Sequence, residues 1–152
     1  MRLTKDQAYV EIAKVIAKRS SCIRRAVGAV AVDRDGYILA TGYNGVAAGL
    51  NHCNEQINGE YPHACLGAKA PSGTNLDACG ALHAEQNLIL HLKDPREVET
   101  VYLTTSPCVS CVKLLMGTAA KRIVFVQEYP NSETSKALWL SKNRIWEHYK
   151  DA

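Results

Sequence analysis

Four side chains in two short segments have the types and spacing of a metal centre with a proton carrier. His83 lies two residues before Glu85, and Pro107 is followed by Cys108 and Cys111. Imidazole and thiolate are ligands that zinc prefers, and three protein ligands leave one coordination position for water. Such an ion lowers the pKa of its water to roughly 7, and a neighbouring carboxylate can move the proton. We expect His83, Cys108 and Cys111 to bind zinc and Glu85 to be the catalytic acid–base.

The backbone expected around these residues favours the same assignment. Both segments are predicted to open a helix, where the partial positive charge of the N-terminus stabilises thiolates. Cys108 and Cys111 are three residues apart and share one helix face. His83 and Glu85 are two residues apart and would point to opposite sides inside a helix. They can therefore serve one site only at the helix entrance, with different roles.

Each half of the pattern, taken alone, also fits a protein that is not an enzyme of this kind. A C-x-x-C pair occurs in structural zinc sites and in redox pairs as well. A structural site normally has four protein ligands and would leave Glu85 without a role. A redox pair needs neither His83 nor Glu85. Only the combination favours catalysis, with a metal-activated water as nucleophile and Glu85 shuttling the protons.

Bulk composition limits the class of protein. The chain has 152 residues, which fits a single domain over residues 1–152, and a formal net charge of +3. This charge is too small for bulk nucleic-acid binding, so we expect no nucleic-acid partner. No apolar run is long enough to cross a membrane, and the first residues carry no secretory signal core. We therefore expect no membrane partner, a cytoplasmic protein, and cysteines that are not a disulfide framework.

The pattern of apolar residues predicts alternating helices and strands. Thr4 and Gln7 have the spacing of a capping box, and the helix that follows should end near Ser20 and Ser21. Residues 42–80 are rich in Gly, Pro and Asn and show no periodicity, which is typical of a functional or metal-stapled loop. The remaining elements are expected as strands at 27–32, 37–41, 100–104, 122–126 and 144–148 and helices at 83–92, 108–119 and 132–142. This order predicts a layered α/β fold with a mixed sheet.

Four segments carry a resemblance that covers nearly the whole chain. They are residues 22–30, 41–45, 83–87 and 106–111, in that order. The chain resembles the cytidine and deoxycytidylate deaminase superfamily, and the Gly-Tyr-Asn-Gly element within 41–45 is most similar to the deoxycytidylate branch. The resemblance implies a three-layer α/β/α cytidine-deaminase-like fold with a central mixed sheet of about five strands. It also implies deamination of dCMP to dUMP and ammonia, which supplies dUMP for thymidylate synthesis.

The resemblance further implies how the nucleoside is held. Asn44 would hydrogen-bond the 3′-hydroxyl of the sugar. The backbone N–H of Ala84 would hold the base carbonyl, and the backbone carbonyl of Ser106 would accept the exocyclic amine. An Asn-Gly pair is also a turn signal, because both residues tolerate positive φ. Asn44 and Gly45 can therefore form a turn instead of a binding element, or do both.

A phosphate site is implied by the same resemblance. Arg24 or Arg25, together with Tyr129, would bind the 5′-phosphate, which suits the fork geometry of a guanidinium. The alternative for the two arginines is a solvated helix end. The sequence does not decide which arginine binds.

Regulation and assembly are expected on resemblance alone. Such enzymes are commonly homohexamers or dimer-based oligomers, activated by dCTP and inhibited by dTTP, with Mg²⁺ accompanying the triphosphate. The regulatory loop would involve Gly42, Tyr43, Gly45 and Gly49. A second, structural zinc is also implied, with Cys22, Cys53 and Cys79 as ligands and His63 or Cys65 completing the set. The alternative is that these cysteines are small buried apolar residues.

Three rival functions remain. A deaminase of cytidine or adenosine in RNA should carry a basic stripe, which the net charge of +3 does not favour. A deaminase of a free nucleoside or base would leave Arg24, Arg25 and Tyr129 without a phosphate partner. A non-catalytic module that binds zinc or a nucleotide would have no use for Glu85.

Overall fold

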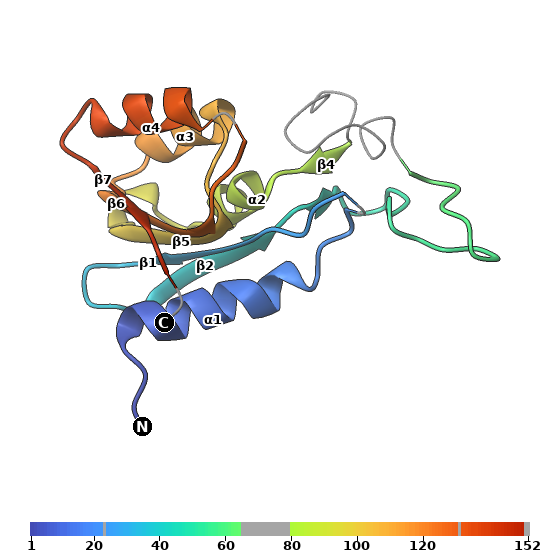
Figure 1. The fold of residues 1–152 in the computed structure, drawn as a ribbon, viewed down its shortest axis with the longest axis horizontal. Helices are drawn as coiled ribbons and strands as arrows, with labels where there is room; N and C mark the ends of the chain where they lie inside the picture. Colours follow the sequence, from blue (N-terminus) through green and yellow to red (C-terminus); the bar gives the residue numbers. More distant parts are fainter. Residues whose placement is uncertain (23, 65–79, 131, 151–152) are drawn as a thin grey trace.

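The chain folds into three layers with a five-stranded sheet in the middle (Figure 1). The computed structural model describes residues 1–22, 24–64, 80–130 and 132–150. The helices are α1 (Lys5–Ala17), α2 (Ala84–Leu90), α3 (Val109–Met116) and α4 (Glu133–Leu140), with a short 3₁₀ helix, η3 (Pro95–Glu97). The strands are β1 (Gly28–Val32), β2 (Ile38–Tyr43), β3 (Gly45–Val46), β4 (Ala81–Leu82), β5 (Thr100–Thr105), β6 (Arg122–Gln127) and β7 (Ile145–His148). Helix α1 covers one face of the sheet, and α2, α3 and α4 cover the other. The expected three-layer α/β/α fold is confirmed.

The sheet is mixed, as predicted. Its strand order is β2-β1-β5-β6-β7. Strand β1 is antiparallel to both neighbours, with Gly28 opposite Tyr43 and Ala29 opposite Leu103. Strands β5, β6 and β7 are parallel to one another. Parallel strands require crossover connections, and α3 and α4 supply them on a single face.

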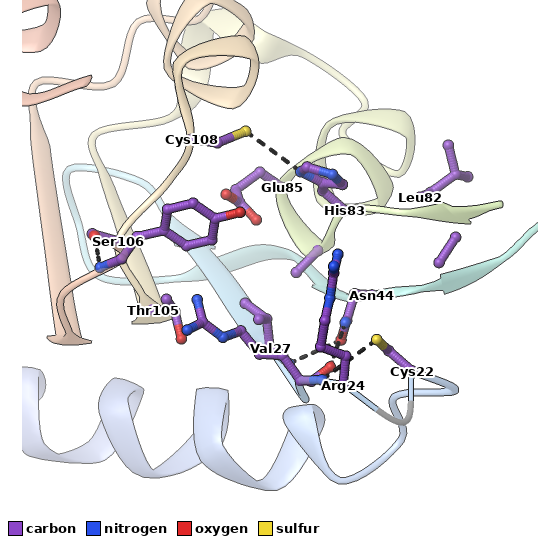
Figure 2. Close-up of a pocket in the computed structure, with 14 residues that line it drawn as sticks. Cys22, Arg24, Val27, Asn44, Leu82, His83, Glu85, Thr105, Ser106 and Cys108 are labelled. Carbon is purple, nitrogen blue, oxygen red and sulfur yellow. Dashed lines mark hydrogen bonds between the residues drawn. The ribbon is translucent and has the colours of Figure 1, made fainter. Parts of the chain in front are cut away.

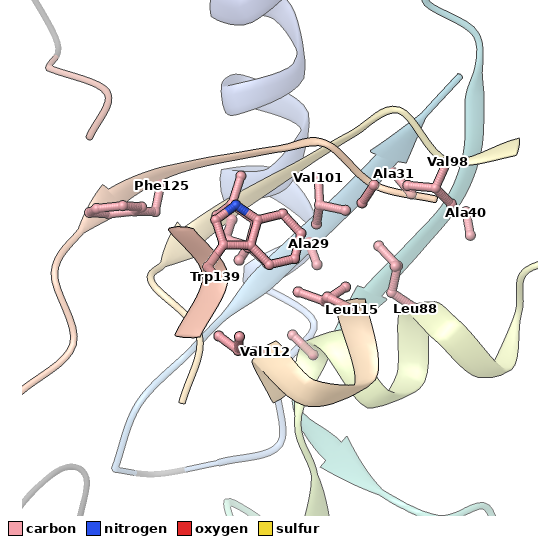
Figure 3. Packing of buried hydrophobic residues seen from close by; sticks show 14 residues of the cluster. Ala29, Ala31, Ala40, Leu88, Val98, Val101, Val112, Leu115, Phe125 and Trp139 are labelled. Carbon is pink, nitrogen blue, oxygen red and sulfur yellow. The ribbon is translucent and has the colours of Figure 1, made fainter. Parts of the chain in front are cut away.

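Both faces of the central strands are buried, which accounts for their continuous apolar sequence. In β1, Ala29 and Ala31 face the core beneath α2–α4, whereas Val30 and Val32 face α1. The larger core lies on the three-helix side around the fully buried Trp139 (Figure 3). The buried indole N–H of this residue has a hydrogen-bond partner, because it donates to the Ile145 carbonyl at 2.9 Å. This bond joins α4 to the last strand.

The first helix begins where the sequence predicts and ends one turn earlier. Thr4 and the Gln7 side chain form both bonds of the capping box. The α-helix ends at Ala17, not near Ser20 and Ser21 as expected. Lys18, Arg19 and Ser20 continue the spiral with bonds to carbonyls three residues back, which is a tighter turn. The expected extra turn therefore exists, but not as α-helix.

In the described part of the stretch expected to be irregular, residues 45 and 46 form strand β3, one half of a short ribbon. Strands β3 and β4 pair antiparallel, with Gly45 opposite Leu82. A two-residue strand is too short to show periodicity, so the sequence did not reveal it. The ribbon brings the chain after β2 next to the residues just before His83. No helix in the described ranges is long and apolar enough to cross a membrane.

Candidate active site

The expected metal ligands meet at the starts of two helices. His83 is the N-cap of α2 and Cys108 is the N-cap of α3, both with extended backbone. The His83 Nδ1 atom lies 3.5 Å from Cys108 Sγ and 3.3 Å from Cys111 Sγ (Figure 2 shows the first of these contacts). Among the described residues, these three form the one cluster of donors that could hold a metal. Residues distant in the chain converge because α2 and α3 pack on the same face of the sheet.

The spacing of these donors suits tetrahedral zinc. Zinc bonds of ~2.3 Å to sulfur and ~2.0 Å to nitrogen, at tetrahedral angles, place the two donors roughly 3.5 Å apart. The two nitrogen–sulfur distances at His83 agree with this separation. The set is also one imidazole and two thiols, which is a zinc-type donor set. Three protein ligands leave a fourth position for water or substrate.

The two thiols do not ionise alike. A hydrogen bond from Cys111, with a further one from His83, lowers the pKa of the Cys108 thiol to about 4. The bond shared with Cys108 and burial both raise the pKa of Cys111. The two close sulfur atoms share a proton in this arrangement, and a cation bound between them would favour its loss.

Glu85 is a buried carboxyl group beside these ligands. It is the second residue of α2, is only 4% exposed, and lines the same pocket as His83 and Cys108 (Figure 2). Burial raises its pKa to about 7, so the group can both accept and donate a proton near neutral pH. His83 and Glu85 both lie at the entrance of α2, where the sequence predicts them, with His83 as N-cap and Glu85 in the first turn.

The pocket joins the metal cluster to the residues expected to bind a nucleotide. Its wall includes all of the expected substrate residues, which come from five separate segments of the chain. These are Arg24, Arg25, Asn44, Ala84, Ser106 and Tyr129. The apolar part of the wall, which the sequence did not indicate, is formed by Val27, Ala81 and Leu82. A pocket of this kind suits a flat ring with a charged tail.

Arg25 and Tyr129 are in direct contact. The Cζ atom of Arg25 lies 4.9 Å from the centre of the Tyr129 ring. Within the described part of the chain, Arg25 Nη1 is the one buried side-chain nitrogen or oxygen without a hydrogen-bond partner. Burying such a donor unpaired costs about 1–3 kcal/mol. A cationic donor in this state is ready to receive an anion.

Tyr129 is fixed at its backbone. Its N–H donates to the Ser106 hydroxyl at 2.7 Å, and the Ser106 N–H donates to the Gln127 carbonyl at 2.9 Å. Burial raises the pKa of Tyr129, so its hydroxyl stays protonated and can donate. The loop after β6 is thereby attached to the loop before α3, which carries the thiols.

Asn44 has its side chain engaged with the backbone of the segment that leads into β1. Its Oδ1 accepts from the Val27 N–H at 2.8 Å, and its Nδ2 donates to the Arg25 carbonyl at 2.7 Å. Positive φ, which a turn of the expected kind would use, occurs at neither Asn44 nor Gly45. An amide has two hydrogens and two lone pairs, so one of each stays available to a ligand. The structure thus gives Asn44 a supporting role that no local sequence signal indicated.

The residues expected to hold a second zinc do not form a cluster among the described parts of the chain. Cys22 lines the main pocket and its sulfur accepts from the Arg25 N–H at 3.4 Å. Cys53 is buried, and His63 pairs with Glu55 at 3.7 Å. Cys65 and Cys79 lie outside the described residues. The second zinc stays a prediction.

The residues expected in a regulatory loop belong to different elements. Gly42 and Tyr43 end strand β2, and Gly45 begins β3. Gly49 lies in the turn that follows, with φ of +89°. Of these four residues, only Gly49 lies outside a strand.

Comparison with known proteins agrees with this geometry. Residues 3–127 match the family model described as the cytidine and deoxycytidylate deaminase zinc-binding region. The chain therefore belongs to the family of zinc-binding cytidine and deoxycytidylate deaminases. The match includes all three donors of the cluster and Glu85.

Individual relatives are named deoxycytidylate deaminase. The proteins of Saccharomyces cerevisiae and Schizosaccharomyces pombe are 35% and 37% identical over 137 and 126 residues, which are 89% and 82% of this chain. The chain spans only 41% and 37% of those fungal proteins. The protein of Mycobacterium phage D29 is 33% identical over 127 residues, which are 81% of this chain and 94% of the phage protein.

A solved structure shows the same fold. It is a dCMP deaminase from the cyanophage S-TIM5 in complex with dCMP and dUMP, with a TM-score of 0.74 and 25% identity. The match covers 98% of this chain and 99% of that one.

Proposed function

We propose that this protein hydrolyses dCMP to dUMP and ammonia with zinc as cofactor. One observation carries the proposal. A single pocket contains the zinc-type donors, the buried carboxyl of Glu85, and the unpaired buried Nη1 of Arg25. The first two suit hydrolytic deamination, and the third suits the phosphate of a nucleotide over a free nucleoside. The names of the fungal and phage relatives support the same substrate.

The cluster of His83, Cys108 and Cys111 would hold the ion. Zinc bound there supplies a water acidified enough to act as the nucleophile at neutral pH. The protein's part is to keep three donors together and one coordination position open. The positions of Cys108 at the N-cap of α3 and of Cys111 in its first turn support this, because helix N-termini stabilise anionic thiolates.

Glu85 would move the protons of the reaction. With a pKa raised to about 7, its carboxyl accepts a proton from the attacking water and delivers it to the ring nitrogen. Its second transfer is to the departing amine, which leaves as ammonia. One group can perform both transfers because Glu85 is buried in the pocket wall beside the metal cluster.

The base and sugar would be held by groups around the pocket. We propose that the Ala84 N–H bonds the base carbonyl and the Ser106 carbonyl accepts the exocyclic amine. The free lone pair and hydrogen of the Asn44 amide are available to the 3′-hydroxyl. Ala84 and Ser106 are buried in the pocket wall, so these backbone groups are shielded from competing water.

Arg25 and Tyr129 would bind the 5′-phosphate, with Arg24 beside them. The contact of the Arg25 guanidinium with the Tyr129 ring supports Arg25 as the main ligand. The unpaired Nη1 supports this choice too, since a phosphate oxygen would satisfy it.

A direct assay tests the proposal. Ammonia release is measured from dCMP, deoxycytidine, dCTP and single-stranded DNA, with the wild-type protein and with Glu85→Gln. We expect dCMP to be the best substrate and Glu85→Gln to lose about 10²–10⁴-fold in kcat while keeping its zinc. Equal rates for the two proteins would refute the mechanism, and a preference for deoxycytidine would refute the phosphate assignment.

We also propose regulation by end products and assembly into a homo-oligomer of hexameric or dimeric type. Family membership supports dCTP as activator, dTTP as inhibitor and Mg²⁺ as the companion of the triphosphate, as well as a role in dUMP supply for thymidylate. The assay is dCMP turnover at subsaturating substrate with each triphosphate, with and without Mg²⁺. Insensitivity to both triphosphates would refute regulation, and light scattering gives the oligomeric state.

A further inference from the structure

Asn87, to which neither the motif nor the proposed mechanism gives a task, connects helix α2 to strand β2. It lies four residues after His83 in α2, and its N–H donates to the His83 carbonyl at 3.0 Å. Its side-chain Nδ2 donates to the Tyr43 carbonyl at 2.7 Å. Tyr43 is the last residue of β2, which is one of the two edge strands of the five-stranded sheet. One side chain thus fastens the helix of the metal cluster to the end of an edge strand.

The joint is tight because a glycine precedes Tyr43. A Cβ at Gly42 would lie 2.3 Å from the Ala84 carbonyl oxygen and 2.6 Å from the Leu88 N. Helix α2 therefore rests directly on the backbone of β2. The Asn87 bond holds the next carbonyl along the strand, so the helix and the strand end cannot slide past each other while it is intact.

Asn44 connects the end of β2 to the segment that carries Arg25, the proposed phosphate ligand. It follows Tyr43, and its backbone N–H donates to the Val27 carbonyl at 3.3 Å. Its side chain bonds the Val27 N–H and the Arg25 carbonyl at 2.8 and 2.7 Å. The backbone on both sides of Ala26 is thereby fixed, and Arg25 reaches the Tyr129 ring from it. A continuous path of contacts leads from α2 to the guanidinium.

We infer that Asn87 is a positioning residue for nucleotide phosphate: it holds the strand end that keeps Arg25 in the pocket. The inference rests on the proposed function, because it concerns recognition of the phosphate of dCMP. Asn87 acts through other residues and takes no part in proton transfer. Its loss should therefore weaken binding of the phosphorylated substrate more than it slows the chemical step.

The first test compares two variants at this position. Asn87→Asp keeps the shape but cannot donate when ionised, and its charge faces the Tyr43 carbonyl. Asn87→Gln keeps an amide donor. We expect Asn87→Asp to raise KM for dCMP roughly tenfold, which is the change in affinity that the loss of one hydrogen bond produces. The zinc content should be retained, and kcat should change much less. Deoxycytidine, which has no phosphate, should show a smaller change in KM, and Asn87→Gln should recover part of the loss.

A matched control is Asp33, which lies in the turn that joins β1 to β2, at the opposite end of this strand pair from Tyr43. The Asp33 side chain accepts from the Asp35 and Tyr37 N–H groups, both at 2.9 Å, far along β1 and β2 from the pocket. Asp33→Ala should lower stability without changing the ratio of the KM values for dCMP and deoxycytidine. An equal change for both substrates in Asn87→Asp, as a purely structural role would give, overturns the inference.

Hydrogen exchange separates this inference from the proposed function. The amides of residues 25–27 should exchange faster in Asn87→Asp than in wild type, while those of β5 and β6 stay unchanged. Unchanged exchange at residues 25–27 overturns the inference whatever the substrate is. Failure of the wild-type protein to prefer dCMP over deoxycytidine overturns the proposed function instead.

Discussion

The guanidinium of Arg25 lies over the Tyr129 ring, with 4.9 Å between Cζ and the ring centre. The two residues come from loops at different strands, before β1 and after β6. Their contact leaves the Nη1 of Arg25 buried and unpaired. No carboxylate of the described residues pairs with this guanidinium, so its charge is not neutralised and keeps its attraction for an anion.

Arg25→Lys is the first prediction. Lysine keeps the charge but loses the planar fork and its stacking on Tyr129, so we expect KM for dCMP to rise by about 10- to 100-fold. KM for deoxycytidine should change little. Arg19→Lys is the control, because Arg19 lies over the Tyr43 ring at 5.9 Å but does not line the pocket. Equal losses on both substrates would contradict the phosphate role.

Gly42→Ala is expected to damage both stability and activity. Its Cβ would meet backbone atoms of Ala84 and Leu88, which cannot rotate away, so α2 must shift. We expect a loss of about 1–3 kcal/mol in the free energy of unfolding, measured by urea denaturation, and reduced kcat because Glu85 moves with the helix. Gly80→Ala is the control, since a Cβ there meets nothing within 4 Å. Equal stability for the two variants would show that α2 is not seated on Gly42.

Removal of a thiol ligand should remove the ion. A neutral serine hydroxyl is a poor ligand for zinc, so Cys108→Ser should lose both bound zinc and activity, as metal analysis and the ammonia assay would show. Cys53→Ser should keep activity, because Cys53 is outside the pocket. The amount of zinc in Cys53→Ser also tests the predicted second site. A zinc-loaded, fully active Cys108→Ser protein would contradict the assignment.

A pH-dependent contribution to stability is predicted at Asp6. Its carboxylate accepts from Arg122 at 2.7 and 3.0 Å and from the Tyr102 hydroxyl at 2.5 Å. The hydrogen bond with Arg122 lowers the pKa of Asp6 below its ordinary value of 3.8. A lowered pKa in the folded state means that the stabilisation is complete above pH 3.8 and is lost as the pH falls through the folded value.

Asp6→Asn should therefore be less stable than wild type by about 1–3 kcal/mol at pH 7, and the difference should shrink below about pH 4. Denaturation with urea at several pH values measures it. Glu11→Gln is the control, because the Glu11–Lys14 pair at 3.4 Å is exposed and contributes little. A pH-independent difference for Asp6→Asn would contradict the lowered pKa.

The metal cluster was predictable because its signals are local. His83, Glu85, Cys108 and Cys111 each lie within two residues of a helix start, and their chemical types and spacing suffice to assign them to one centre. The strands were predictable for a similar reason. Residues of β1 are apolar without interruption, which indicates burial on both faces.

Tertiary contacts account for what the sequence did not reveal. The choice between Arg24 and Arg25 depends on a partner, Tyr129, that lies about a hundred residues further along the chain. The two hydrogen bonds of the Asn44 side chain to the backbone of Val27 and Arg25 have no local signature. Strands β3 and β4 have two residues each and pair although they are far apart in the chain. Such short strands show no alternation of apolar and polar residues that could have predicted them.

The position of α2 on the bare backbone at Gly42 has a consequence for engineering. The metal cluster and Glu85 lie at the starts of helices that pack on the sheet, whereas the proposed phosphate-binding residues lie on loops that the side chains of Asn44 and Ser106 hold by hydrogen bonds. Under the proposed function, changes at residues 24–27 and 128–130 should therefore alter the preference among phosphorylated and unphosphorylated pyrimidines and leave the metal cluster and Glu85 in place. Libraries confined to those two loops offer the shortest route to new specificities.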